Sequence, residues 1–191
     1  MHVIVLAAGA STRFGSPKQL ASVGGRGLLE TVLDRAMQLA GPEVTVVLGA
    51  DAPAIRASLG STGASFVIND RHQEGISSSI RAGLAQLPAS VEAVLVLLGD
   101  QVAVTTEDLR RLLASWENAR DRIVAAQYGE VIGAPAIFPS DLFGALKGLQ
   151  GDQGARALLM RHFDRVITVP VATAAIDVDT VEDLQKLQRT D

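Results

Sequence analysis

Residues 3–18 read VIVLAAGASTRFGSPK, and this stretch decides the fold class. The run from Val3 to Leu6 is apolar throughout, which is typical of a strand buried on both faces. Small residues and glycines follow at once, so the backbone at the end of this strand is open to close approach. No basic leader precedes the run, and it is too short for a signal peptide. We therefore expect a buried first strand.

The rest of the chain alternates between similar short runs and helical patterns. Further strands are predicted at Val44–Leu48, Phe66–Ile68, Val94–Leu98, Ile123–Ala126 and Val166–Val169. Helical spacing of apolar residues predicts helices over 29–39, 77–87, 109–116 and 180–187, the third opened by a capping box at Thr105 to Asp108. Such alternation predicts an α/β fold with a three-layer, Rossmann-like, mostly parallel twisted sheet and helices on both faces. Tyr128 to Pro139 interrupts the pattern and is interpreted as a loop with a short inserted strand.

Composition limits the possible functions. With 191 residues, 48% of them apolar, the chain is expected to form a single domain over 1–191. A net charge of −4 argues against a nucleic-acid partner. The absence of cysteine excludes disulfides, thiolate nucleophiles and Cys-ligated metals. The longest apolar run, Ala93 to Leu98, is far too short to span a membrane, so we expect a cytoplasmic protein with no membrane partner.

The glycine-containing loop after the first strand carries the first functional signal. Its backbone N–H groups can form an anion-binding concavity, and Arg13 and Lys18 add two positive charges. The spacing from Gly9 to Gly15 matches neither the Walker A motif nor the dinucleotide fingerprint. Two interpretations follow: a phosphate-binding loop, or an ordinary turn with surface cations.

Carboxylates supply the second signal. Asp100 follows the strand Val94–Leu98 through Gly99, and in open α/β sheets ligands bind beyond the carboxyl ends of strands. Gly9, Asn69 and Asp100 are therefore expected to share one edge of the sheet. Asp100 fits either a Mg²⁺ ligand or a turn aspartate. Asp177 and Asp179 flank Val178, so only one of the two can face such a metal in an extended segment, and Asp179 can equally cap a helix.

Several motifs together resemble a known family. The order of the motifs over about 170 residues is similar to that of the nucleotidyltransferase superfamily, and most similar to its molybdenum cofactor cytidylyltransferase branch. The matching segments are Leu6–Lys18, Glu74–Gly83, Gly99–Gln101, Gly133–Pro135, Gly151–Arg156 and Asp177–Thr180. Ala8 matches the cytidylyl branch, whereas the guanylyl branch typically carries glycine there.

The resemblance implies a fold of the nucleotide-diphospho-sugar transferase type and a Mg²⁺-dependent transfer of CMP from CTP. The implied acceptor is phosphorylated molybdopterin or molybdenum cofactor, pyrophosphate is released, and a molybdoenzyme or its chaperone is a further implied partner. Residues 1–105 would form the nucleotide-binding half and 106–191 the acceptor-binding half.

Site residues are implied by the same resemblance. The catalytic residues would be Arg13, Lys18 and Asp100, and the metal ligands Asp100 and Asp179. The nucleotide would contact Leu6, Ala7, Ala8, Gly9, Ser11, Arg13, Lys18, Ser77, Ser78, Arg81 and Gly99. The acceptor would contact Gln101, Gly133, Pro135, Asp152 and Arg156.

Three positions depart from the family pattern. Phe14 stands where methionine is usual, Val102 where proline is usual, and Ala134 where histidine is common. The last two lie on the acceptor side and leave the acceptor open. The alternatives are a nucleotidyltransferase with another base or acceptor, a non-catalytic nucleotide-binding maturation protein, and a relative that reduces a small molecule with a nicotinamide cofactor.

Overall fold

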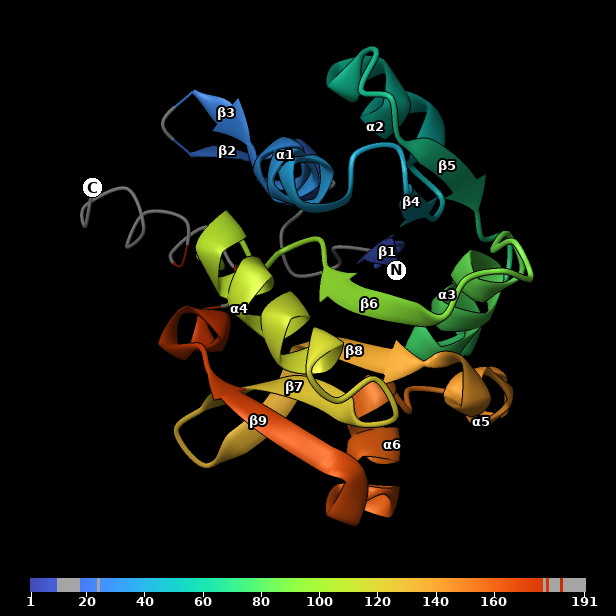
Figure 1. Ribbon diagram of the computed structural model, residues 1–191. Helices are drawn as coiled ribbons and strands as arrows, with labels where there is room; N and C mark the ends of the chain where they lie inside the picture. The colour runs from blue at the N-terminus through green and yellow to red at the C-terminus, as the bar shows by residue number, and fades with distance from the viewer. Residues whose placement is uncertain (10–17, 24, 177, 179–182, 184–191) are drawn as a thin grey trace.

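The computed structural model describes residues 1–9, 18–23, 25–176, 178 and 183. Within them a seven-stranded sheet runs in the order β5-β4-β1-β6-β8-β7-β9 (Figure 1). Its strands are β1 (His2–Ala7), β4 (Val44–Leu48), β5 (Ser65–Ile68), β6 (Ala93–Leu98), β7 (Ile123–Tyr128), β8 (Val131–Pro139) and β9 (Val166–Pro170). A separate hairpin pairs β2 (Ser22–Val23) with β3 (Arg26–Gly27).

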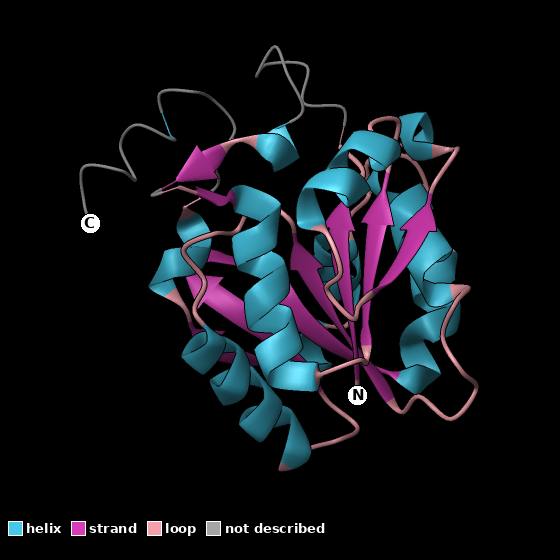
Figure 2. Ribbon diagram, turned by 90° about the horizontal axis from the view of Figure 1, so that it is seen from above, coloured by secondary structure: helices cyan, strands magenta, loops and turns pink. Residues whose placement is uncertain are grey.

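Helices cover both faces of the sheet (Figure 2). One face packs against α1 (Leu28–Ala40), α2 (Ala52–Leu59) and α4 (Thr106–Glu117). The other packs against α3 (Ile76–Leu84), α5 (Phe143–Lys147) and α6 (Ala155–Arg161). Short 3₁₀ turns complete the chain at η1 (Lys18–Leu20), η2 (His72–Glu74), η3 (Ser140–Leu142), η4 (Phe163–Arg165) and η5 (Ala172–Ala175). None of the helices in these ranges is long and apolar enough to cross a membrane.

The predicted α/β sheet is confirmed. β1 pairs in parallel with β4 and with β6, and the residues of β1 are buried on both faces, so alternate side chains enter the two cores. At the start of α4 the expected capping box is present, with Asp108 N donating to Thr105 Oγ1 over 3.1 Å. The helix predicted over 77–87 ends earlier, at Leu84, and the one predicted over 180–187 lies outside the described residues.

One prediction about the sheet is wrong. Tyr128 to Pro139 is not a loop with a short inserted strand, because β8 runs for nine residues inside the sheet, antiparallel to both β6 and β7. A register shift between Ala125 and Ala126 lets β8 carry two extra residues, Ala134 and Pro135, that pair with nothing on β7. Proline has no N–H to donate, so this bulge is where the strand tolerates it.

Candidate functional site

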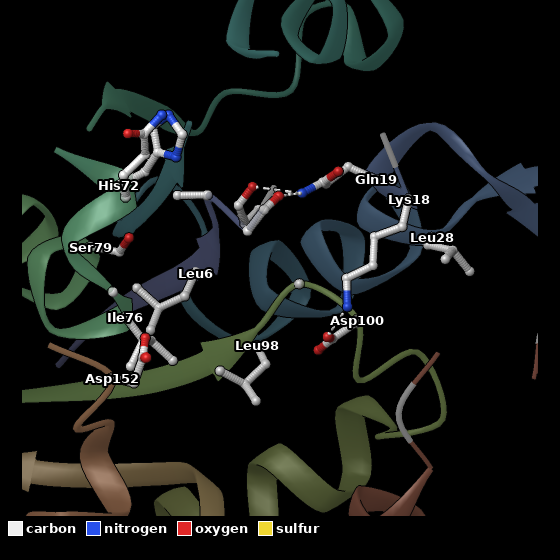
Figure 3. Close-up of a pocket in the computed structure, with 16 residues that line it drawn as sticks. Leu6, Lys18, Gln19, Leu28, His72, Ile76, Ser79, Leu98, Asp100 and Asp152 are labelled. Carbon is white, nitrogen blue, oxygen red and sulfur yellow. Dashed lines mark hydrogen bonds and ion pairs between the residues drawn. The ribbon is translucent and has the colours of Figure 1, made fainter. Parts of the chain in front are cut away.

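A cavity of about 400 Å³ lies beyond the carboxyl ends of β1 and β6 (Figure 3). That volume falls within the roughly 300–1,000 Å³ of small-molecule sites. The walls come from the end of β1, from η1, from the turn after β6, and from the η2–α3 junction. The predicted site residues on its lining are Leu6, Ala7, Ala8, Gly9, Lys18, Gly99, Asp100 and Asp152.

An ion pair joins the two predicted functional segments across this cavity. Lys18 Nζ lies 2.6 Å from Asp100 Oδ2, and the two side chains are only 17% and 19% exposed. Figure 3 shows the ammonium pointing at the carboxylate. The residues are 82 positions apart in the chain, so the pairing arises from the parallel neighbours β1 and β6, whose carboxyl ends meet at one edge.

The second oxygen of the Asp100 carboxylate has no hydrogen-bond partner among the described residues. Asp100 Oδ1 is buried and accepts no hydrogen bond from the described residues. Buried polar atoms are normally partnered, and an unpartnered carboxylate oxygen on a residue that lines a cavity has the chemistry of a ligand for a hard divalent cation. The described residues contain no group of three or more His, Asp or Glu that could hold a metal by itself. A cation at Asp100 would therefore draw its other ligands from substrate oxygens, water or the undescribed residues.

Gln19 organises the loop at the end of β1. Its side-chain Nε2 donates to Ala7 O and to Gly9 O, each over 3.0 Å. The turn after β4 supports the same backbone, because a Cβ on Gly49 would lie 2.6 Å from Ala8 O. The sequence motifs did not single out Gln19, and its place next to Lys18 was the available signal.

The start of α3 forms a second wall. Asn69 Nδ2 donates to Ser78 Oγ over 2.8 Å and to Ser79 Oγ over 3.1 Å, which anchors the helix start to the end of β5. Ser79 reaches the cavity lining, whereas Ser77 and Ser78 do not. Ser77 is fully buried, and Ser78 Oγ donates to Gly75 O over 2.8 Å. Both predicted serines therefore support the wall from behind.

Arg81 is not brought together with Lys18 and Asp100. Its guanidinium donates to Leu149 O, to Ser77 Oγ over 3.2 Å and to Glu74 Oε2 over 3.2 Å. It lines a separate hollow between η2 and the 147–151 segment. In this arrangement Arg81 fastens α3 to the segment that follows α5.

The predicted acceptor residues are dispersed. Asp152 lines the cavity, and Arg156 is exposed on α6. Gln101 is 1% exposed and donates to Ala134 O over 2.9 Å, so it ties the end of β6 to β8. Gly133 and Pro135 are buried in β8. Ser11, Arg13, Asp177 and Asp179 lie outside the described residues.

Comparison with known proteins identifies the family of this chain. Residues 3–166 match the MobA-like NTP transferase domain. The chain belongs to that family. It is therefore a nucleotidyltransferase by family, and its sheet order and helical layers are those of an α/β nucleotide-diphospho-sugar transferase fold.

The similar proteins and solved structures carry names of different kinds. Nicotine blue oxidoreductase of Paenarthrobacter nicotinovorans is 32% identical over 195 residues, covering 96% of this chain and 94% of that protein. The bifunctional protein GlmU of Burkholderia mallei is 33% identical over 135 residues, and the match spans 29% of its length. The crystal structure of Rv0371c from Mycobacterium tuberculosis is 31% identical, with a TM-score of 0.83 over 98% of this chain and 96% of that one. A manganese complex of Rv0371c is 29% identical, with a TM-score of 0.81 over 98% and 97%.

Proposed function

We propose that this MobA-like enzyme transfers CMP from CTP to a phosphorylated pterin-type acceptor, molybdopterin or molybdenum cofactor, in a Mg²⁺-dependent reaction that releases pyrophosphate. The observation that carries the proposal is the Lys18–Asp100 pair at the cavity, with one carboxylate oxygen left unpartnered. A cation and a free carboxylate oxygen at one point suit a ligand that brings both phosphate oxygens and a metal. Ala8 in the first loop supports the choice of CTP by its resemblance to the cytidylyl branch.

The chemistry needs no general base. An oxygen of the acceptor phosphate is already anionic near neutral pH and attacks the α-phosphorus of the triphosphate. A new P–O bond forms, the bond to the bridging α–β oxygen breaks, and its electron pair leaves with pyrophosphate. The obstacle is repulsion between anions, so the protein contributes mainly by positioning the two substrates and offsetting their charge.

The residues would divide this work as follows. Lys18 would offset charge on the leaving pyrophosphate, aided by Arg13, and the backbone of residues 6–9 with Ser11 and Gly99 would hold the nucleotide. Asp100 would hold Mg²⁺, with Asp179 as the second expected ligand. When bound, Mg²⁺ supplies Lewis-acid polarisation of phosphate oxygens and a template for the triphosphate. The related manganese complex of Rv0371c supports a divalent metal in this family.

The acceptor would enter from the second half of the chain. Residues 1–105 contribute most of the cavity lining, which supports a nucleotide-binding half, and Asp152 reaches the cavity from 106–191. We assign acceptor binding to that half, with Asp152 as the residue best placed for it. A molybdoenzyme or its chaperone would receive the product.

The direct test is turnover. Purified protein is supplied with CTP, GTP or ATP, Mg²⁺ and molybdopterin, and pyrophosphate release is measured. The proposal expects release with CTP that requires both the metal and the acceptor. Equal or faster release with GTP would contradict the base assignment, and no release with any triphosphate would contradict the activity.

A reductase is the second candidate. It is favoured by the likeness to nicotine blue oxidoreductase over 96% of this chain. Thermal shift separates the two candidates, with CTP and NADPH each tested with and without Mg²⁺. Stabilisation by CTP that needs metal supports the transferase, and metal-independent stabilisation by NADPH alone supports the reductase.

A further inference from the structure

The Gln19 side chain fastens η1 to the backbone at the end of β1. It is 7% exposed, and its Nε2 donates to Ala7 O and Gly9 O, which lie 12 and 10 residues earlier in the chain. Figure 3 shows both bonds running from the amide to the loop backbone. One side chain therefore joins η1 to the backbone at and just after the end of β1, on the cavity wall.

The chemistry of this contact favours an amide. A glutamine amide has two N–H donors on one nitrogen and can therefore serve two carbonyl oxygens at once without adding a charge. Ala7 and Gly9 line the cavity, and an unengaged carbonyl oxygen beside a bound polyanion would repel it. Donation from Gln19 offsets the partial negative charge of both oxygens. Leucine would donate to neither oxygen, and a glutamate carboxylate would repel them.

Gln19 also holds the base of the neighbouring cation. Both residues belong to the single turn η1, whose end is fixed by Ala21 N donating to Lys18 O over 3.0 Å. The Lys18 side chain extends from this turn, and its Nζ lies 2.6 Å from Asp100 Oδ2. The position of the ammonium therefore depends on where η1 is fastened, and Gln19 fastens η1 to the end of β1.

We propose that Gln19 is a positioning residue for the triphosphate: it holds two loop carbonyls away from the phosphates and sets the reach of Lys18. This inference rests on the proposed nucleotide-binding function. It assigns Gln19 no contact with the reacting atoms, so its loss should weaken nucleotide binding more than it slows a bound complex.

The test compares Gln19→Leu and Gln19→Glu with the wild type by calorimetric titration with CTP and Mg²⁺. Loss of two hydrogen bonds predicts that the Kd of Gln19→Leu for CTP is raised by roughly 10-fold or more. The kcat for pyrophosphate release should change less. Gln86→Glu is the matched control for Gln19→Glu. Gln86 is exposed beyond α3, and both substitutions change the net charge equally. The Kd of Gln86→Glu is expected to equal that of the wild type.

Acidification gives a second readout that a merely structural role would not produce. A protonated glutamate can donate one hydrogen bond, whereas the carboxylate can donate none. Burial and the donor role both favour the protonated form, which raises the pKa of an introduced carboxyl above its ordinary value of about 4.3. The Kd of Gln19→Glu, relative to the wild type at the same pH, should therefore fall from about pH 8 to about pH 5.5, while that of Gln19→Leu stays constant.

The outcomes are distinct. If the wild type binds no nucleoside triphosphate, the proposed function fails and this inference falls with it. If the wild type binds CTP and Gln19→Leu binds it equally well, only the inference is overturned. If Gln19→Leu does not fold, the pH dependence of the Kd of Gln19→Glu decides. A Kd ratio between Gln19→Glu and the wild type that does not change with pH overturns the inference.

Discussion

Gly75→Ala tests how the cavity wall is built. Gly75 precedes α3 with φ 96° and ψ 177°, a backbone region that is essentially restricted to glycine. A Cβ there would lie 2.4 Å from the carbonyl carbon and oxygen of Gly151 and 2.6 Å from Asp152 Oδ1. The contact is with backbone, which cannot yield as a flexible side chain can. The substitution should therefore push residues 151–152 away from α3.

The expected cost follows from two contributions. Forcing a Cβ into this backbone region costs about 1–3 kcal/mol. Separating the segments also breaks the bond from Ser77 N to Gly151 O, 3.2 Å long, which contributes about 1 kcal/mol. The sum is about 2–4 kcal/mol, and at about 2–4 °C per kcal/mol for a chain of this size it lowers Tm by about 4–16 °C.

Scanning calorimetry measures this shift, and Gly129→Ala is the control. Gly129 also has a positive φ, 60°, but a Cβ on it would meet nothing within 4 Å. Its cost is expected to be limited to about 1–2 kcal/mol of backbone strain. Gly75→Ala should in addition weaken binding of CTP with Mg²⁺, because the wall that carries Asp152 is displaced, whereas Gly129→Ala should not. Equal Tm values and equal affinities for the two variants would refute the reasoning.

Two further predictions concern charged groups. Burial alone would raise the pKa of Asp108, but hydrogen bonds from Thr105, Arg111 and Thr173 outweigh it and hold that pKa below its ordinary value. The stabilisation is therefore fully present above the unfolded-state pKa of about 3.9 and is lost as pH falls through the lower folded-state pKa. Urea unfolding of Asp108→Asn and wild type should therefore differ at pH 7, and the difference should shrink progressively as the pH is lowered below about 3.9. Replacing either Lys18 or its carboxylate partner by alanine should lower the rate of pyrophosphate release by more than about 10-fold, and near-normal rates would count against the mechanism.

The strands that position the site could be predicted because their pattern depends only on burial. β1 and β6 are apolar on both faces, and parallel strands between helical layers require that pattern. β8 could not be predicted, since Gly133 and Pro135 are ordinary loop signals. Gly133 pairs with Ala126, and the bulge opposite Ala125–Ala126 accommodates Pro135, which nothing in the local sequence indicates.

The site itself was predictable to the level of the sheet edge. The carboxyl ends of β1 and β6 meet, so topology brings Asp100 and the chain that leaves β1 to one edge of the sheet, and the bonds of Gln19 then hold Lys18 there. The directions of individual side chains could not be predicted from the topology. Successive residues of a helix turn by about 100°, so small differences in where α3 begins decide whether Ser78 or Ser79 faces the cavity. The direction of Arg81, and the bonds of Gln19, depend on backbone carbonyls from distant segments.

The central claim is that Asp100 and Lys18 together receive a metal-bound nucleoside triphosphate. Calorimetric titration of CTP with and without Mg²⁺, on wild type, Asp100→Asn and the exposed control Asp121→Asn, tests it most directly. We predict metal-dependent binding in the wild type and the control, and loss of the metal dependence in Asp100→Asn. Unchanged metal dependence in Asp100→Asn, or binding to the wild type that is equally tight without metal, would contradict the claim.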